Sequence, residues 1–290
     1  MKFAASLAFT DTEDYVELAQ VAEEHGWETL VLSDHVVHPE KIASKYPYRE
    51  DGQRPWEAPD HWPDVWVAMA AMGAATRRLR FLTGVYVVPM RNPFHLAKAI
   101  GTAAVLTSYR VELGIGLGWM RDEFALLGED FDSRAVRTAE MIEVMRKLWT
   151  GEMVEHHGRF YDFDRLNMRP AVRGAIPLIV GGVTEAALRR AARIGDGWIP
   201  HAIRTAEARD AIAAIRRHRA DSPRAGEPFS AVVPLTDAFD PDGYRRAEDA
   251  GVTHALTTPW MLYGGSHRSL ADKRDGLRRF ADEVIAKMSS

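Results

Sequence analysis

The chain has 290 residues, a formal net charge of −4 and no cysteine. The lack of cysteine excludes disulfides, thiolate metal ligands and cysteine nucleophiles. Basic residues are scattered, so no stripe favours nucleic acid, and no apolar run approaches the roughly 20 residues that span a bilayer. The short apolar start leads directly into Asp11, Glu13 and Asp14, unlike a signal peptide. We therefore expect a soluble, cytoplasmic protein with no nucleic-acid or membrane partner.

Apolar runs alternate with amphipathic segments through the first half of the chain. This alternation predicts strand–helix–strand units of a parallel sheet. The predicted strands are residues 2–8, 29–33, 80–88 and 110–113. The predicted helices are residues 14–25, 64–75, 93–106 and 133–149, with a short acidic helix over 122–127.

Residues 36–63 interrupt this alternation with a long, polar, proline-rich segment. It nevertheless contains Tyr46, Tyr48, Trp56 and Trp62. Loops of this length inside compact domains are usually lids, binding loops or disordered, and aromatic residues argue against disorder. The segment is therefore expected to be an insertion with a binding role, and Trp56 is a candidate substrate-pocket residue.

The second half of the chain continues the alternation after a predicted hairpin over residues 152–166. Predicted strands follow at residues 176–180, 197–200, 229–233 and 253–257, and helices at 184–194, 205–219, 241–250 and 269–288. Eight strand–helix units in one domain spanning residues 1–290 predict an α/β fold, the (β/α)8 TIM barrel. Its insertions would be residues 36–63, after strand two, and 152–175, after helix four. A doubly wound open sheet is the alternative, but no dinucleotide fingerprint marks a first βα turn.

The stretch RVELGIGLGWMRDEFALLG, residues 110–128, places glycines at alternate positions just past a strand. Gly114, Gly116 and Gly118 lead into Trp119. Glycines allow backbone to approach backbone or ligand closely, because no Cβ intervenes. The residues alone leave two interpretations open: a tight strand-to-helix turn, or a platform for a flat ring with a phosphate tail.

In a TIM barrel the active site lies at the C-terminal ends of the strands. Asp34 and His35 come directly after strand two, and a carboxylate beside a histidine favours a catalytic pair for proton transfer. His201 follows strand six and Trp260 follows strand eight, so both are candidate substrate-pocket residues. Gly84, inside strand three, indicates a bulge or a simple kink.

A small-residue turn stands at the junction of strand five and helix five. Backbone N–H groups at such a helix N-terminus form a ready anion site, and the alternative is tight packing with an ordinary threonine cap. The residues of this turn are Gly181, Gly182, Val183 and Thr184. The following helix carries Arg189, Arg190 and Arg193.

Histidine pairs do not indicate a metal site. His35 and His38 are three apart, and His156 and His157 are adjacent but lie in the predicted insertion. A zinc site needs three or four convergent ligands. We interpret these histidines as loop residues and predict no metal.

Six motifs in this order resemble those of the bacterial luciferase-like superfamily, from the first strand to the last helix. More narrowly, the chain is similar to its actinobacterial F420-dependent oxidoreductases. The motifs are LSDH, TGVYVVP, RVELGIGLGWMRDEF, PLIVGG, IGDGWIP and TPWMLYGG.

The resemblance implies a TIM barrel that binds the tricyclic ring of F420, or alternatively FMN, at its mouth. Gly84 and Val85 match a non-prolyl cis peptide that backs the ring, and Asp34 and His35 match a catalytic pair near the reacting face. The resemblance also suggests a homodimer. The implied cofactor-binding residues, several through backbone amides to the phosphate tail, are Gly84, Val85, Gly116, Gly118, Trp119, Gly181, Gly182, Val183 and Thr184.

Two departures put sugar-phosphate substrates in doubt. Trp119 stands where the sugar-phosphate dehydrogenases of the family have an acid, and Pro39 stands where a tryptophan is expected. Three functions follow as hypotheses: F420-dependent hydride transfer, FMN-dependent monooxygenation with a separate reductase, and a barrel that binds a phosphorylated ligand without redox chemistry.

Overall fold

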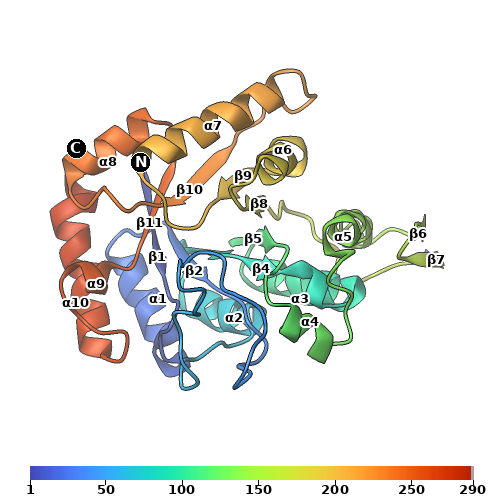
Figure 1. Ribbon diagram of the computed structural model, residues 1–290, viewed down its shortest axis with the longest axis horizontal. Coiled ribbons are helices and arrows are strands. Elements are labelled where there is room, and N and C mark those ends of the chain that lie inside the picture. The colour runs from blue at the N-terminus through green and yellow to red at the C-terminus, as the bar shows by residue number, and fades with distance from the viewer. Residues whose placement is uncertain (289–290) are drawn as a thin grey trace.

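A computed structural model describes residues 1–288. It contains a closed barrel of eight parallel strands with helices between them, which confirms the predicted TIM barrel (Figure 1). The barrel closes where β3 pairs with β5. Around the barrel the strands are β3 (Arg80–Thr83), β2 (Thr29–Leu32), β1 (Lys2–Ser6), β11 (His254–Thr257), β10 (Ser230–Pro234), β9 (Gly197–Ile199), β8 (Leu178–Gly181) and β5 (Val111–Gly116).

The third barrel strand is broken, so the prediction of one continuous strand over residues 80–88 is wrong. A cis peptide between Gly84 and Val85 separates β3 from β4 (Tyr86–Val87), as the family resemblance implied. Both pieces pair with β5. Phe81 pairs with Val111 of β5, and Tyr86 pairs with Ile115 of β5. Between these two pairs the broken strand advances by five residues, whereas β5 advances by four. The extra residue is accommodated as a bulge at the barrel mouth.

Helices surround the barrel and connect its strands. The longer ones are α1 (Tyr15–Glu24), α2 (Val65–Ala75), α3 (Pro93–Leu106), α5 (Arg134–Trp149), α6 (Glu185–Ile194), α7 (Thr205–Ala220), α8 (Pro241–Asp249) and α10 (Leu270–Phe280). The short ones are η1 (Thr12–Asp14), η2 (Val88–Met90), α4 (Arg121–Leu126), α9 (Pro259–Leu262), η3 (Ala281–Ile285) and α11 (Ala286–Met288). The helix predicted over residues 269–288 is thus interrupted by the π-helical turn η3.

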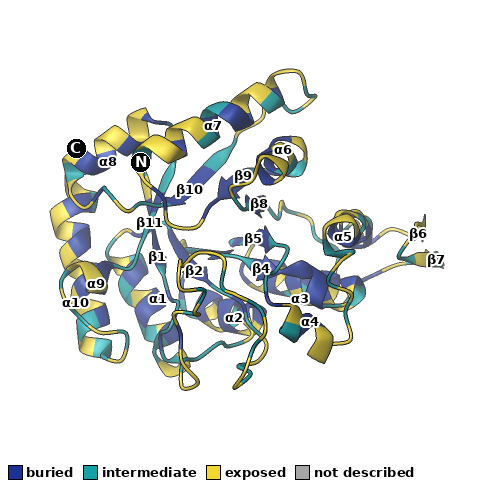
Figure 2. Cartoon of the chain, viewed as in Figure 1, coloured by how far each residue is buried: buried dark blue, intermediate teal, exposed yellow. Residues whose placement is uncertain are grey.

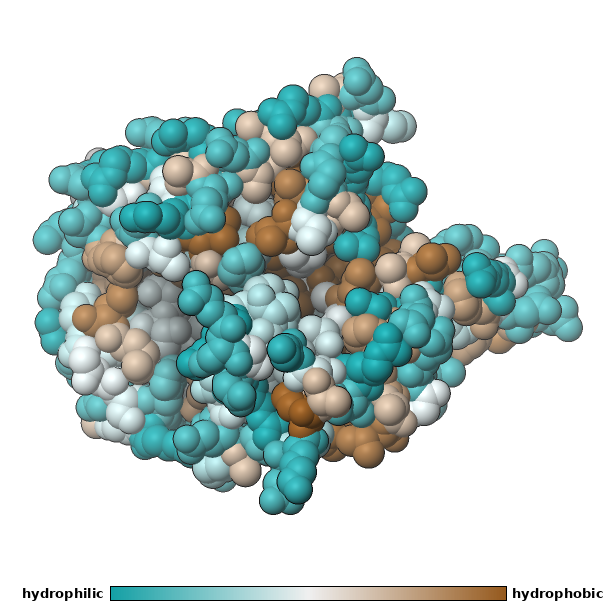
Figure 3. All heavy atoms as spheres, viewed as in Figure 1, coloured by the Kyte–Doolittle hydropathy of each residue, from teal (hydrophilic) through white to brown (hydrophobic). Residues whose placement is uncertain are grey.

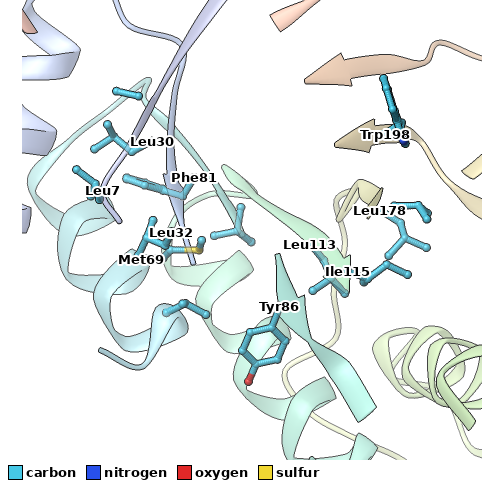
Figure 4. Close-up of a cluster of buried hydrophobic side chains, with 14 of the residues drawn as sticks. Leu7, Leu30, Leu32, Met69, Phe81, Tyr86, Leu113, Ile115, Leu178 and Trp198 are labelled. Atoms are coloured by element: carbon cyan, nitrogen blue, oxygen red, sulfur yellow. The ribbon is translucent and has the colours of Figure 1, made fainter. Parts of the chain in front are cut away.

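Alternating side chains of the strands form two apolar layers, as the two-residue period of a strand requires. In β2, Val31 belongs to the small cluster inside the barrel, whereas Leu30 and Leu32 belong to the large cluster between strands and helices. Figure 4 shows part of the outer cluster, including Leu30, Phe81 and Trp198. Buried residues therefore follow the barrel wall, and exposed residues the outer helix faces (Figure 2).

Two segments depart from the strand–helix alternation. Within the described residues, the stretch between β2 and α2 holds no helix or strand, and we call residues 36–63 the mouth loop. The predicted hairpin is confirmed: β6 (Val154–His157) and β7 (Asp162–Leu166) pair antiparallel and project beside α5 (Figure 1). None of the helices in residues 1–288 is both long enough and apolar enough to span a membrane.

Candidate active site

A cavity of about 380 Å³ lies at the barrel mouth, lined by the segments that follow β1, β2, β4, β5, β8 and β9. Its volume falls within the roughly 300–1,000 Å³ of small-molecule sites. In the space-filling view, hydrophobic residues gather towards the middle of one face and hydrophilic residues occupy most of its rim (Figure 3). The predicted site residues that line the cavity are Asp34, His35, Trp56, Gly84, Val85, Gly116, Gly118, Trp119, Gly181, Gly182, Thr184 and His201.

The base of the cavity is built around the side chain of Val85. A Cβ on Gly116 would lie 2.4 Å from Val85 Cγ2, and a Cβ on Gly181 would lie 2.9 Å from Val85 Cγ1. A Cβ on Gly84 would likewise lie 2.4 Å from Val31 Cγ1. Real Cβ atoms do not approach so closely, so the bulge at Val85 requires glycine at these positions. The result is a surface of backbone and one short apolar side chain, against which a flat ring can pack. We call Gly84, Val85, Gly116 and Gly181 the glycine base.

One end of the cavity has the character of an anion site. Gly182, with φ of +112°, turns the chain into α6, and Thr184 caps that helix by accepting a hydrogen bond from the amide of Ala187 at 3.3 Å. The first N–H groups of a helix lack intrahelical partners and carry partial positive charge. Arg190 of α6 also lines the cavity.

The guanidinium of Arg190 makes no hydrogen bond or ion pair within residues 1–288, although the side chain is half-buried. Burial, together with the nearby Arg193, lowers its pKa. A bound anion would remove that destabilisation, because charged groups removed from water need a partner of opposite sign. The helix N-terminus and Arg190 together therefore suit a phosphate.

His35 is held by a carboxylate on another element, Glu123 of α4. Its Nδ1 atom lies 2.9 Å from Glu123 Oε2, and Glu123 Oε1 also accepts the amides of Val36 at 2.5 Å and Val37 at 3.3 Å. Burial opposes ionisation of Glu123, but these hydrogen bonds outweigh burial and lower its pKa. The ionised carboxylate fixes the proton on Nδ1. His35 Nε2 has no hydrogen bond within the described residues, and the side chain lines the cavity.

Asp34 does not pair with His35, so the predicted Asp34–His35 couple is wrong. The Asp34 carboxylate accepts two hydrogen bonds from Arg91, each 2.7 Å, and one from the amide of Val87 at 2.9 Å. Arg91 in turn lies over the ring of Tyr86, 4.2 Å from its centroid. Asp34 therefore holds the backbone of Val87, just past the cis peptide, together with Arg91, while His35 pairs with Glu123.

Aromatic rings of the mouth loop surround His35. Its ring centroid lies 4.6 Å from that of Trp56 and 4.8 Å from that of Trp62. Tyr48 stacks on His201 across the mouth at 4.9 Å and 26°. We call the rings on this side of the cavity the aromatic wall: Tyr46, Tyr48, Trp56, Trp62 and Trp119.

The mouth loop is fixed at both ends by polar contacts. The carboxylate of Asp122, next to Glu123 in α4, accepts hydrogen bonds from the amides of Ala43 at 2.8 Å and Ser44 at 3.1 Å. The hydrogen bond from Ala43 is the largest cause that lowers the pKa of Asp122, to about 2. Near the other end of the loop, the carboxylate of Asp60 accepts a hydrogen bond from the guanidinium of Arg268 at 2.9 Å. α4 therefore positions both His35 and the first part of the loop.

Two predicted residues lie elsewhere. Trp260 is fully buried and lines no part of the cavity, so its assignment to the substrate pocket is wrong. Pro259 starts the short helix α9 directly after β11, and α9 packs on α10 so closely that a Cβ on Gly276 would lie 2.4 Å from Trp260 Cα. Val183 is likewise absent from the cavity lining, because its side chain is exposed at the start of α6.

Sequence reasoning missed several cavity residues. Glu123 lies in the predicted acidic helix, but nothing local links it to a histidine 88 positions away. Tyr46, Tyr48 and Trp62 stood out as aromatics in a polar loop, and that signal could have placed them beside Trp56. Arg190 stood out in the helix after the small-residue turn.

Comparison with known proteins decides the family. The profile of the luciferase-like monooxygenase family matches residues 4–282. The chain belongs to this family. An uncharacterised protein of Mycobacterium tuberculosis is 38% identical over 291 residues, covering 99% of this chain and 100% of that protein. An F420-dependent glucose-6-phosphate dehydrogenase of Gordonia bronchialis is 30% identical over 289 residues, covering 97% and 79%.

Solved structures of luciferase-like proteins share the fold. An F420-dependent secondary alcohol dehydrogenase in complex with an F420–acetone adduct superposes with a TM-score of 0.74 at 19% identity, covering 99% of both chains. The oxygenating constituent of an FMN-bound Baeyer–Villiger monooxygenase from Pseudomonas putida superposes with a TM-score of 0.68 at 15% identity, also covering 99% of both. The luciferase-like relatives thus include F420-dependent oxidoreductases and FMN monooxygenases.

Proposed function

We propose that this protein is an F420-dependent oxidoreductase that transfers hydride to or from a small organic substrate at the barrel mouth. The observation that carries the proposal is the pairing of His35 with Glu123 at 2.9 Å, beside a glycine base suited to a flat ring. The names of the F420-dependent relatives at 30% identity or above support the same choice of cofactor.

The residues that line the cavity fit both the ring and the phosphate tail of such a cofactor. The glycine base offers a flat, apolar surface to the ring. The backbone of Gly182 and Thr184 and the guanidinium of Arg190 would hold the phosphate of the tail, because Arg190 otherwise has no ionic partner within residues 1–288. Bound F420 would supply a carbon centre that accepts or gives a hydride.

His35 would move the proton that accompanies the hydride. In the oxidative direction its Nε2 atom takes the proton of a substrate hydroxyl as the adjacent carbon gives up hydride and the C=O bond forms. In the reductive direction the same nitrogen returns the proton to the carbonyl oxygen. Glu123 stabilises the imidazolium formed in the first case and keeps Nδ1 protonated in both.

A fluorescence titration with F420 and, separately, FMN tests the proposal. Trp56, Trp62 and Trp119 line the cavity, so a bound ring should quench their emission. Micromolar F420 binding with much weaker FMN binding supports hydride transfer. The reverse preference makes the protein the FMN-dependent monooxygenase, which would need a separate reductase. Binding of neither contradicts both.

The homodimer suggested by the resemblance stays a proposal. Val67, Ala71 and Ala74 form an exposed apolar stripe along α2 at helical spacing, and such a stripe is suited to a second copy. Light scattering after size exclusion tests it: a mass near twice 32.5 kDa supports the dimer, and a mass near 32.5 kDa contradicts it.

A further inference from the structure

We infer that the substrate of this site is an uncharged, largely apolar alcohol or carbonyl compound, and that the aromatic wall selects it against phosphorylated and carboxylated molecules. The inference rests on the proposed function for the reaction itself. Its physical basis is the distribution of charge around the cavity, which can be tested without any cofactor.

The carboxylates that line the cavity already have hydrogen-bond partners. Apart from the histidines, the charged residues that line it are Asp34, Glu123 and Arg190. The two carboxylates are buried and satisfied by Arg91 and by His35 with backbone amides. They cannot neutralise an anionic substrate, and their charges repel one. Arg190 lies on α6, among the residues suited to the phosphate of the cofactor.

Cations of the mouth loop do not reach the cavity. Lys41, Lys45, Arg49 and Arg54 are absent from its lining. Arg54 instead donates to His38 at 2.6 Å and to the carbonyl of Pro39 at 2.7 Å, while Arg49 pairs with Asp51. An anionic group placed at the aromatic wall would therefore lose its water without gaining a lysine or arginine partner, which is unfavourable.

The aromatic wall suits a flat or apolar molecular skeleton. Tyr46, Trp56 and Trp119 contact one another edge to face, with ring centroids 5.2 to 6.1 Å apart. Such surfaces bind apolar groups by burial and by ring contacts. His35, with Nε2 free, stands against Trp56 and can meet a hydroxyl or carbonyl oxygen, and the buried Nε1 of Trp62 is a further donor without a partner within residues 1–288.

This inference separates the chain from relatives named as glucose-6-phosphate dehydrogenases. Trp119 and Pro39 depart from the pattern of sugar-phosphate dehydrogenases: Trp119 is part of the wall, and the carbonyl of Pro39 accepts a hydrogen bond from Arg54. Trp119 presents an indole ring to the cavity at this position. The same position gains contact with Tyr46, 5.2 Å away.

Three probes that share one ring and differ in charge test the inference. Binding of acetophenone, benzoate and phenyltrimethylammonium is measured by calorimetry, with glucose 6-phosphate as a fourth probe. The measurement uses the full chain without cofactor, as the wild type and as the Arg190→Ala variant, which lacks the unpaired cation of the α6 side, and is repeated with F420. The ranking in the variant decides whether the wall rejects anions. We expect acetophenone to bind at least about tenfold more tightly than benzoate or glucose 6-phosphate. Tighter binding of either anion, or of phenyltrimethylammonium, overturns the inference.

Variants locate the binding on the wall. Tyr48 is half exposed, so Tyr48→Ala carries little risk for folding, and Phe239→Ala removes a similarly exposed ring outside the cavity. Tyr48→Ala should weaken the binding of acetophenone several-fold and leave the binding of F420 unchanged. Phe239→Ala should change neither affinity. Equal acetophenone binding by both variants overturns the assignment to the wall. Since the probe ranking is measured without cofactor, loss of F420 binding overturns the proposed function separately.

Discussion

The two sides of the cavity differ in the way they treat charge. On the α6 side, a helix N-terminus and Arg190 present positive charge that has no partner within residues 1–288. On the α4 side, each carboxylate that lines the cavity is hydrogen-bonded to neighbouring groups, and aromatic rings cover the rest. This difference fits the two proposed tasks: the α6 side would bind the anionic tail of a cofactor, and the α4 side would position an uncharged substrate and move its proton.

The largest effect should come from His35 on the α4 side. Replacing it by asparagine removes the proton-transfer group, so kcat should fall by about 10²–10⁴-fold. The Kd of F420 should stay within about twofold of the wild type, because tail binding is assigned to the other side. Steady-state kinetics and fluorescence titration measure the two quantities. A parallel loss of F420 affinity would break the separation between the sides.

Glu123→Gln should have the next largest effect. It keeps the shape of the side chain but removes the negative charge that stabilises protonated His35, so we expect kcat to fall about 100-fold with KM little changed, within the range of general acid–base effects. The pH profile of kcat should also change, which a merely structural role would not produce. Asp132→Asn is the control, because its exposed carboxylate pairs with Arg121 away from His35.

Arg190→Ala tests whether the α6 side of the cavity binds the phosphate of the cofactor tail. Loss of a charge-assisted contact to phosphate should raise the Kd of F420 about tenfold. We expect kcat at saturating cofactor to be unchanged. Arg189→Ala on the same helix is the matched control, because Arg189 is exposed and pairs with Glu185. Similar Kd values for the two variants would remove Arg190 from the tail site.

The smallest effect concerns stability. The lowered pKa of Glu123 means that its contribution to stability is fully present above its unfolded pKa of about 4.3 and is lost as the pH falls through the lower folded value. Glu123→Gln should therefore lower the free energy of unfolding by about 2 kcal/mol at pH 7. Urea denaturation should show a smaller difference at pH 3. A difference that grows towards acid pH would contradict the ionised pair.

The barrel was predictable because its signals are local. Apolar runs with helical or strand period, and helix-capping residues such as Thr184 and Ser269, lie in the segments that they describe. The break between β3 and β4 was not predictable from periodicity, since Tyr86 and Val87 continue the apolar run. It arises from close packing of Val85 against glycines on other strands.

The site was only partly predictable because its pairings are not local. The small residues at the barrel mouth were found correctly as cavity-lining positions. The partner of His35 was not: adjacency in sequence suggested Asp34, but Arg91, from a distant segment, takes that carboxylate, and Glu123 of α4 reaches His35. Trp260 failed for a related reason, since a position after a strand does not fix which way the next helix turns.

A crystal structure of the F420 complex is the most direct test of the division of the cavity into a cofactor side and a substrate side. We expect the phosphate of the tail within hydrogen-bonding distance of the Gly182–Thr184 backbone and of Arg190. We also expect the ring against Val85, with open space between the ring, His35 and the aromatic wall. A tail bound along the mouth loop, or a ring that displaces His35 from Glu123, would contradict the division of the cavity into a cofactor side and a substrate side.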